Sequence, residues 1–194
     1  SDAVTFFAIG DPQINIPKWG TAGTEQTIDA MNALPGQPFP LGGVVDTPRG
    51  VLIAGDLVDD TTNPANWALY KTLFDPRGNA RLRFPVFEGV GNHDFDMQGG
   101  YAQWSYVQRD VIARNAQRAA KISSDNNRYH YSWDWGPVHF VNLGIVVGSD
   151  PQLKRPGRYN PLESYSFLKA DLERNVGSSG RPVVITHHID VARY

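Results

Sequence analysis

The sequence predicts an α/β fold with layered sheets. Short apolar runs typical of buried strands alternate with longer segments typical of helices. Four of the apolar runs end in polar residues that are able to bind a metal, and ligand sites of open α/β folds form at the carboxyl ends of strands. The 194 residues suffice for one compact domain with a core, so we expect a single domain over residues 1–194.

Three strands and two helices are expected in the first half of the chain. Asn63 before Pro64 indicates a helix start, because an Asn side chain caps a helix and proline is favoured at its first position. For the earlier helix, Thr24 or Thr27 is the expected cap. The expected strands lie at 4–9, 51–54 and 84–90, the helices at 24–34 and 64–74, and a loop rich in Pro and Gly at 35–49.

The second half is expected to begin with a helix and to continue with a hairpin, a helix and a strand. Gly136 and Pro137 separate two apolar runs rich in aromatic and β-branched residues, which is the pattern of a hairpin. The expected helices lie at 101–120 and 161–175, the hairpin strands at 129–135 and 138–143, and the last strand at 182–186.

Composition narrows the class of protein. Acidic residues number 20 and basic residues 18, so the net charge of −2 gives no support for nucleic-acid binding through bulk charge. No apolar run approaches the roughly 20 residues of a transmembrane helix. Cysteine is absent, which excludes disulfides, thiolate metal sites and a cysteine nucleophile. Among the possible compartments, we favour that of a secreted or periplasmic protein.

Four polar clusters follow the expected strands. Burying an acidic group at each strand end is costly unless the charges share a partner, and a cation is an economical shared partner. Three of the clusters begin with a glycine, which is expected to let the backbone turn sharply. The plainer alternative is turn and cap chemistry, since Asp after Gly is common in turns. The clusters are Gly10-Asp11-Pro12-Gln13, Gly55-Asp56-Leu57-Val58-Asp59, Gly91-Asn92-His93-Asp94 and His187-His188.

These clusters resemble the motifs of the calcineurin-like metallophosphoesterase superfamily, which includes purple acid phosphatases and bacterial phosphodiesterases. Its motifs read D-x-H, G-D-x-x-D, G-N-H-D/E, a later His after a strand, and G-H-x-H. The resemblance covers nearly the whole chain. It implies a four-layer α/β/β/α sandwich that hydrolyses a phosphomonoester or phosphodiester with a hydroxide bridging two metal ions (Zn, Mn, Fe, Ca or Mg). The implied substrate is a small-molecule or lipid phosphate ester.

The resemblance also implies metal ligands. Asp11 would bind the first metal, with Gln13 at the position of a usual His ligand. Asp56 would bridge both metals, because a carboxylate has two oxygens to share. Asn92 and His187 would bind the second metal.

The remaining implied roles concern the substrate. His93 would face the ester as an electrophile or as the acid that protonates the leaving oxygen, and Asp59 would hydrogen-bond His93 and favour its protonated form. His188 would contact the substrate or support a ligand. Two ions roughly 3.5–4 Å apart would neutralise the ester's charge and stabilise the entering and leaving oxygens.

Two departures from the family pattern affect these expectations. Gln13 offers an amide oxygen, a weaker ligand than imidazole, although a subset of the family carries Asp-Pro-Gln here. The G-H-x-H motif is missing before Tyr194, so we expect the chain to be truncated at its C-terminal end. One alternative is a degenerate domain that acts as a ligand- or partner-binding module. Another is a phospholipase-type or nucleotide phosphodiesterase.

Other side chains leave alternatives open. Trp19 follows the first cluster and either walls the substrate pocket or anchors its own loop. His139 is interpreted as a hydrogen-bonded core histidine, and His130 as an exposed strand position. Basic residues of the loop 146–160 either contact the substrate phosphate or, as we prefer, are solvated; they are Lys154, Arg155 and Arg158.

Overall fold

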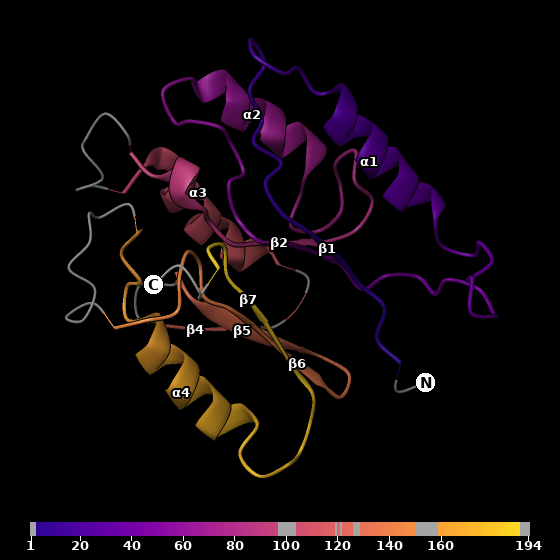
Figure 1. Ribbon diagram of the computed structural model, residues 1–194, viewed down its shortest axis with the longest axis vertical. Helices are drawn as coiled ribbons and strands as arrows, with labels where there is room; N and C mark the ends of the chain where they lie inside the picture. Colours follow the sequence, from indigo (N-terminus) through magenta and orange to yellow (C-terminus); the bar gives the residue numbers. More distant parts are fainter. Residues whose placement is uncertain are drawn as a thin grey trace.

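The computed structural model describes residues 3–96, 104–118, 120, 122–125, 129–149 and 159–190. Its strands form two sheets (Figure 1). The first is parallel, in the order β1-β2-β3, and contains β1 (Phe7–Ile9), β2 (Val51–Ile53) and β3 (Val86–Glu88). The second has the order β4-β5-β6-β7 and contains β4 (Ser123–Ser124), β5 (Tyr131–Trp135), β6 (Val138–Asn142) and β7 (Val183–Thr186).

The second sheet is mixed. β4, β5 and β6 pair antiparallel, and β7 pairs parallel to β6, with Phe140 opposite Val184. The carboxyl end of β7 therefore lies beside the carboxyl end of β6. The expected hairpin around Gly136 and Pro137 is confirmed by β5 and β6.

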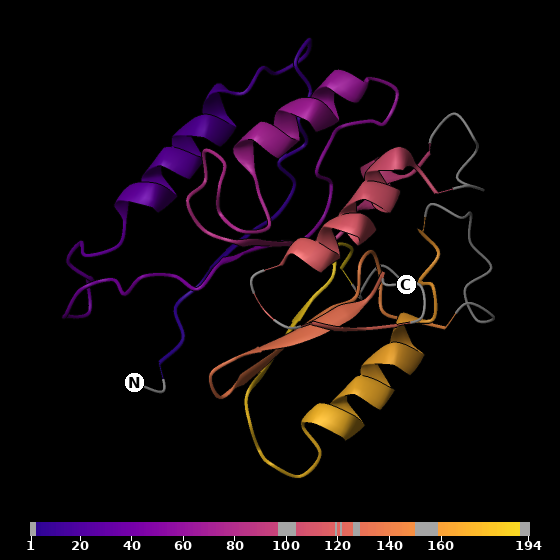
Figure 2. The ribbon, with the colours of Figure 1, turned by 180° about the vertical axis from the view of Figure 1, so that it is seen from behind.

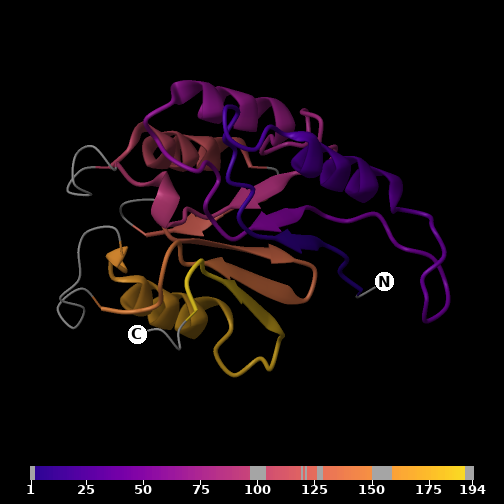
Figure 3. The same cartoon turned by 45° about the horizontal axis from the view of Figure 1, so that its top comes forward.

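Helices cover the outer face of each sheet, which gives four layers (Figure 3). The outer face of the first sheet packs against α1 (Ala22–Ala33), α2 (Pro64–Leu73) and α3 (Tyr106–Arg114). The outer face of the second carries α4 (Ser164–Asn175), which the reverse view shows apart from the other helices (Figure 2). Short 3-10 turns occupy Asn92–Asp94 and Asn115–Gln117. The expected α/β fold with an α/β/β/α order of layers is confirmed.

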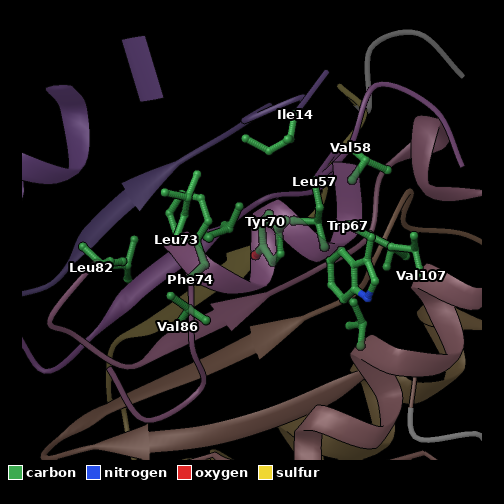
Figure 4. Packing of buried hydrophobic residues seen from close by; sticks show 14 of the residues in the cluster. Ile14, Leu57, Val58, Trp67, Tyr70, Leu73, Phe74, Leu82, Val86 and Val107 are labelled. Atoms are coloured by element: carbon green, nitrogen blue, oxygen red, sulfur yellow. The ribbon is translucent and has the colours of Figure 1, made fainter. Parts of the chain in front are cut away.

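Two buried clusters hold the layers together. The larger joins the first sheet to its helices and includes Trp67, Tyr70 and Phe74 of the α2 region (Figure 4). The smaller lies between the sheets, where Phe87 of β3 stacks on Trp133 of β5 with ring centroids 4.4 Å apart. β2 and β3 are thus buried on both faces, which explains their apolar runs without alternation.

A buried charge cluster lies where β3 meets α3. Glu88 is completely buried and accepts hydrogen bonds from Arg114 at 2.6 Å and Arg118 at 3.1 Å. Burial opposes ionisation of Glu88, but the two guanidinium groups outweigh it and lower the pKa of the carboxyl.

Among the four helices α1 to α4, two begin at a side-chain cap and two, α1 and α4, do not. Asn63 caps α2 by accepting a hydrogen bond from Ala65 N at 3.1 Å, as expected. Ser105 caps α3, so this helix begins later than the expected residue 101. For α1 the expectation was wrong: Thr24 and Thr27 lie inside the helix, and Thr27 Oγ1 instead donates to Gly23 O.

Two histidines of the second sheet differ in outcome. His139 is buried, with Asp134 Oδ1 2.7 Å from Nδ1 and Asp171 Oδ2 2.6 Å from Nε2, which confirms the core interpretation. These contacts connect β5, β6 and α4. His130 is completely buried and donates from Nε2 to Leu162 O, so its expected exposure was wrong. Among the described residues, no helix has the length and apolar character that crossing a bilayer requires.

Candidate metal centre

Metal-competent side chains from three loops meet at one edge of the sandwich. Asp11 follows β1, Asp56 follows β2 and His188 follows β7. One potential ligand atom from each lies within 4.8 Å of the other two. Asn92, after β3, joins them, since its Oδ1 lies 3.1 Å from His188 Nε2. Parallel strands deliver their following loops to the same edge, which is why residues so distant in sequence converge.

Backbone conformation at this edge is unusual. Asp11, Gln13 and Asp56 have φ values of 52°, 40° and 51°, in the left-handed region that non-glycine residues seldom adopt. Hydrogen bonds from Asp11 N to Gly55 O and from Gln13 N to Asp56 O hold the two loops in these conformations. Such strain costs about 1–3 kcal/mol per residue and concentrates at functional sites.

Two glycines allow close contact between the loops after β2 and β3. A Cβ on Gly91 would lie 2.1 Å from Asp56 Oδ1, and one on Gly55 would lie 2.6 Å from Gly91 N. Both positions therefore exclude a side chain. Gly10 differs from the expectation, because a Cβ there would meet nothing within 4 Å and its φ is not left-handed. The sharp turn after β1 belongs to Asp11 itself.

Asp56 lies at the centre of the cluster and is 3% exposed. Its Oδ1 accepts a hydrogen bond from His93 N at 2.9 Å and lies 3.2 Å from His188 Nε2. Its Oδ2 accepts from Gln13 Nε2 at 3.1 Å. Burial raises the pKa of Asp56, but the His188 contact and His93 outweigh it and lower the pKa overall. The carboxylate is ionised at neutral pH, and each oxygen faces a different neighbour.

The other two acid–base groups respond to this charge. Partial desolvation, together with the nearby Asp56 carboxylate, raises the pKa of Asp11 despite the opposing effect of His188, although the residue itself is exposed. For His188, burial lowers the pKa, while Asp56 and Asp11 raise it and prevail. The cluster therefore carries concentrated negative charge that favours a cation.

Of the two adjacent histidines, His188 lies in the cluster and lines its pocket. His188 N donates to Gly144 O, and its Nδ1 donates to Ala54 O at 3.0 Å, which directs Nε2 at Asp56 and Asn92. His187 is not part of this group, and its Nδ1 lies 2.9 Å from Ile189 O. The bend after β7 decides which ring faces inward.

Asp59 contacts His93 differently from the expectation. The contact to His93 Nδ1 comes from the backbone carbonyl of Asp59, whereas the nearer carboxylate oxygen is 3.7 Å away. The carboxylate instead accepts a hydrogen bond from Asn15 Nδ2 at 2.7 Å. Because Nδ1 donates to the carbonyl, His93 Nε2 faces the cluster, 3.9 Å from Asp56 Oδ2.

Asp94 is a functional candidate that motif reading left without a role. Its completely buried carboxylate accepts hydrogen bonds from the backbone N–H groups of Leu57, Val58 and Gly91 at 2.7–3.2 Å. These bonds fasten the loop of Asp56 to the loop of Asn92. Burial raises the pKa of Asp94 to about 7, although these donors lower it. The signal in the sequence was its place directly after Asn-His.

A pocket of about 390 Å³ opens at the cluster. Beyond the four residues already described, its lining includes Tyr159, Ile189 and Asp190, which the sequence analysis did not single out. Lys154, Arg155 and Arg158 lie outside the described residues.

Comparison with known proteins identifies the family. A model of the calcineurin-like phosphoesterase family matches residues 4–192, nearly the whole chain. The chain belongs to the calcineurin-like phosphoesterase family. Calcineurin-like phosphoesterases use metal ions to hydrolyse phosphate esters. Purple acid phosphatase 23 from Arabidopsis thaliana is 30% identical over 113 residues, which cover 54% of this chain and 21% of that protein. The match therefore spans about a fifth of the relative's length.

The donor set fits the divalent ions of calcineurin-like phosphoesterases. Carboxylate, amide and imidazole groups suit zinc, manganese, iron or magnesium. His188 shows the usual arrangement of a metal-binding imidazole, with Nδ1 donating to a carbonyl and Nε2 left for the ion. Gln13 donates from Nε2 to Asp56, and rotation of the amide would present its oxygen instead.

Proposed function

We propose that this chain hydrolyses a phosphate ester with two metal ions held at the carboxyl ends of β1, β2, β3 and β7. The observation that carries the proposal is the convergence of Asp11, Asp56 and His188 within 4.8 Å, with Asn92 against His188. We assign Asp11 and Gln13 to one ion, Asn92 and His188 to the other, and Asp56 to both. His188 replaces His187 in this assignment because its Nε2 faces the cluster.

The remaining chemistry divides between the ions and the chain. When bound, two divalent ions supply Lewis acidity that acidifies a water molecule and neutralises the charge of the ester. Asp56 is suited to a shared position because its two oxygens face different neighbours. Asp94 keeps the loops of Asp56 and Asn92 in register.

His93 is assigned the proton transfer to the leaving oxygen. Its Nδ1–H donates a hydrogen bond to the Asp59 carbonyl, so the proton that passes to the leaving oxygen is the one on Nε2. That nitrogen faces Asp56 across 3.9 Å, and the ring is partly exposed. A partly exposed imidazole that can donate from Nε2 is suited to general acid catalysis.

The test of the proposed function is metal content together with turnover. The full chain is loaded with Mn²⁺ or Zn²⁺ and assayed against chromogenic phosphate monoesters and diesters. Asp56→Asn is expected to abolish turnover with little loss of fold. Asp29→Asn removes an exposed carboxylate on α1 that pairs with Arg81, and serves as the control that keeps activity. Full activity of Asp56→Asn would refute the shared position.

The choice between the two histidines has its own test. His188→Ala is expected to lose one bound ion per chain, whereas His187→Ala is expected to keep both. Metal content is measured by elemental analysis after dialysis. The reverse result would restore the original assignment of His187.

A second candidate function is a degenerate domain that binds a ligand or partner at this pocket. It is favoured by Gln13, whose amide nitrogen donates to Asp56 in place of an imidazole ligand. Less than one tightly bound ion per chain, with no turnover of any ester, would support it. Turnover of diesters alone would instead favour a phosphodiesterase.

A further inference from the structure

Trp19 is exposed in a way that the other tryptophans are not. Its side chain is 53% exposed, whereas Trp67, Trp133 and Trp135 are buried and Trp104 packs against the larger cluster. An indole that anchored its loop would be buried, because burial is what makes a large apolar ring stabilising. Of the two roles left open by the sequence, the anchor is therefore disfavoured.

The loop that carries Trp19 is held by other groups. Lys18 N and Trp19 N donate to Asn15 O, and Ile16 N donates to Asn66 Oδ1 at 3.1 Å. Ile14 is buried in the larger cluster and pairs its backbone with Leu57 and Asp59. The backbone of the loop is thus held by these contacts, and the exposed indole is not needed to anchor it.

The indole lies next to the candidate metal centre. It lines a pocket of about 240 Å³ together with Asp11, Gln13 and the start of α1. Asp11 also lines the larger pocket at the metal cluster, so the two pockets adjoin at that side chain. A substrate held at the cluster therefore reaches Trp19 by extending past Asp11.

A chain of contacts links Trp19 to the proposed proton donor. Lys18 Nζ lies 4.1 Å from the centroid of the indole and 3.8 Å from Asp59 Oδ2. The Asp59 carbonyl in turn holds His93. Because His93 is assigned the leaving oxygen, the Trp19 side of the cluster is the side toward which the leaving group extends.

We propose that Trp19 is a specificity-determining residue that stacks on the leaving group, so that the enzyme prefers phosphate esters whose leaving group carries a planar ring. This inference rests on the proposed function. A flat ring gains contact over a whole indole face, which a puckered ring or a chain matches poorly. Lys18 adds positive charge beside the ring, which suits an electron-rich aromatic group.

The test compares two esters whose leaving groups differ chiefly in the planarity of a six-membered ring. Benzyl phosphate and cyclohexylmethyl phosphate both release a primary alcohol, so their leaving groups are chemically alike. Each is offered to the metal-loaded full chain as a monoester and as its methyl diester. The ratio of kcat/KM for benzyl over cyclohexylmethyl is expected to be about tenfold in the wild type and near unity in Trp19→Ala. Trp19→Phe is expected to retain most of the preference.

The control variant is Phe39→Ala, which removes an exposed aromatic ring that lines none of the pockets around Asp11. It is expected to leave the ratio unchanged. An equal ratio in the wild type and Trp19→Ala would overturn the proposal, and so would a drop of the same size in Phe39→Ala.

Failure of the proposed function would be recognised separately. Calorimetric binding of benzylphosphonate and cyclohexylmethylphosphonate needs no hydrolysis. If no ester is turned over but the benzyl preference in binding still depends on Trp19, the proposed Trp19 subsite is supported and the proposed hydrolytic function is refuted. Absence of phosphonate binding, or binding without a benzyl preference, overturns the subsite.

Discussion

Gly91→Ala is expected to disable the candidate metal centre by displacing one carboxylate. The new Cβ would lie 2.1 Å from Asp56 Oδ1 and 2.3 Å from Asp56 N, and the second of these atoms is backbone. Relief to 3.0 Å, the closest approach of real Cβ atoms, needs a shift of about 0.9 Å, that is 3.0 minus 2.1. Metal–ligand distances tolerate only about ±0.2 Å.

Two magnitudes follow from this clash. Overpacking a well-filled site costs about 1–3 kcal/mol of unfolding free energy. A reacting group misplaced by roughly 1 Å loses on the order of 10²-fold in turnover. Urea denaturation measures the first, and kcat/KM on a chromogenic ester together with metal content measures the second.

Gly10→Ala is the matched control at the end of the neighbouring strand. Its Cβ would meet nothing within 4 Å and its φ is not left-handed, so it should stabilise the fold by about 0.4–1 kcal/mol through the unfolded state. Turnover should be retained. If Gly91→Ala unfolds at the wild-type urea concentration and keeps its metal, close packing of Gly91 on Asp56 is not what places that carboxylate.

The remaining predictions concern the buried carboxylates. Asp94→Ala leaves the buried N–H groups of Leu57, Val58 and Gly91 without their acceptor, so urea denaturation should show a loss of about 3 kcal/mol or more, and elemental analysis a loss of metal; wild-type stability would contradict the fastening role. Glu88 has a folded pKa below its ordinary value of 4.5, so its stabilisation is present above pH 4.5 and is lost as the pH falls through the folded pKa. Urea midpoints should accordingly drop on acidification in the wild type, and less so in Glu88→Gln. This substitution itself should cost about 3–5 kcal/mol of unfolding free energy, because Arg114 and Arg118 lose their carboxylate partner. An equal dependence of the urea midpoint on pH in both proteins would argue against this linkage.

The order of strands and helices could be predicted because apolar patterning is a local property of the chain. Strand ends were harder: the apolar run at 84–90 exceeds β3 (Val86–Glu88) because Phe84 and Val90 are buried by packing without pairing in the sheet. β4 was not expected at all, because Ser123 and Ser124 carry no strand pattern. They form a strand only by pairing with β5.

The site was predictable in its clusters and less so in its details. Asp11, Asp56 and Asn92 follow strands, and parallel pairing brings strand ends together whatever the loops do. The choice between His187 and His188 depends on a bend fixed by Gly144 O, which no local pattern encodes. The role of Asp94 likewise depends on amides 36 and 37 residues away in the chain.

The left-handed backbones at Asp11, Gln13 and Asp56 have a consequence for engineering. Glycine adopts these conformations freely, so selection for heat resistance alone would be drawn toward glycine at all three positions. Each such change would relax the loop while deleting a proposed ligand. Selection for thermostability on this scaffold therefore needs a screen for metal content at every round, because the most stable sequence and the sequence that keeps the proposed ligands differ.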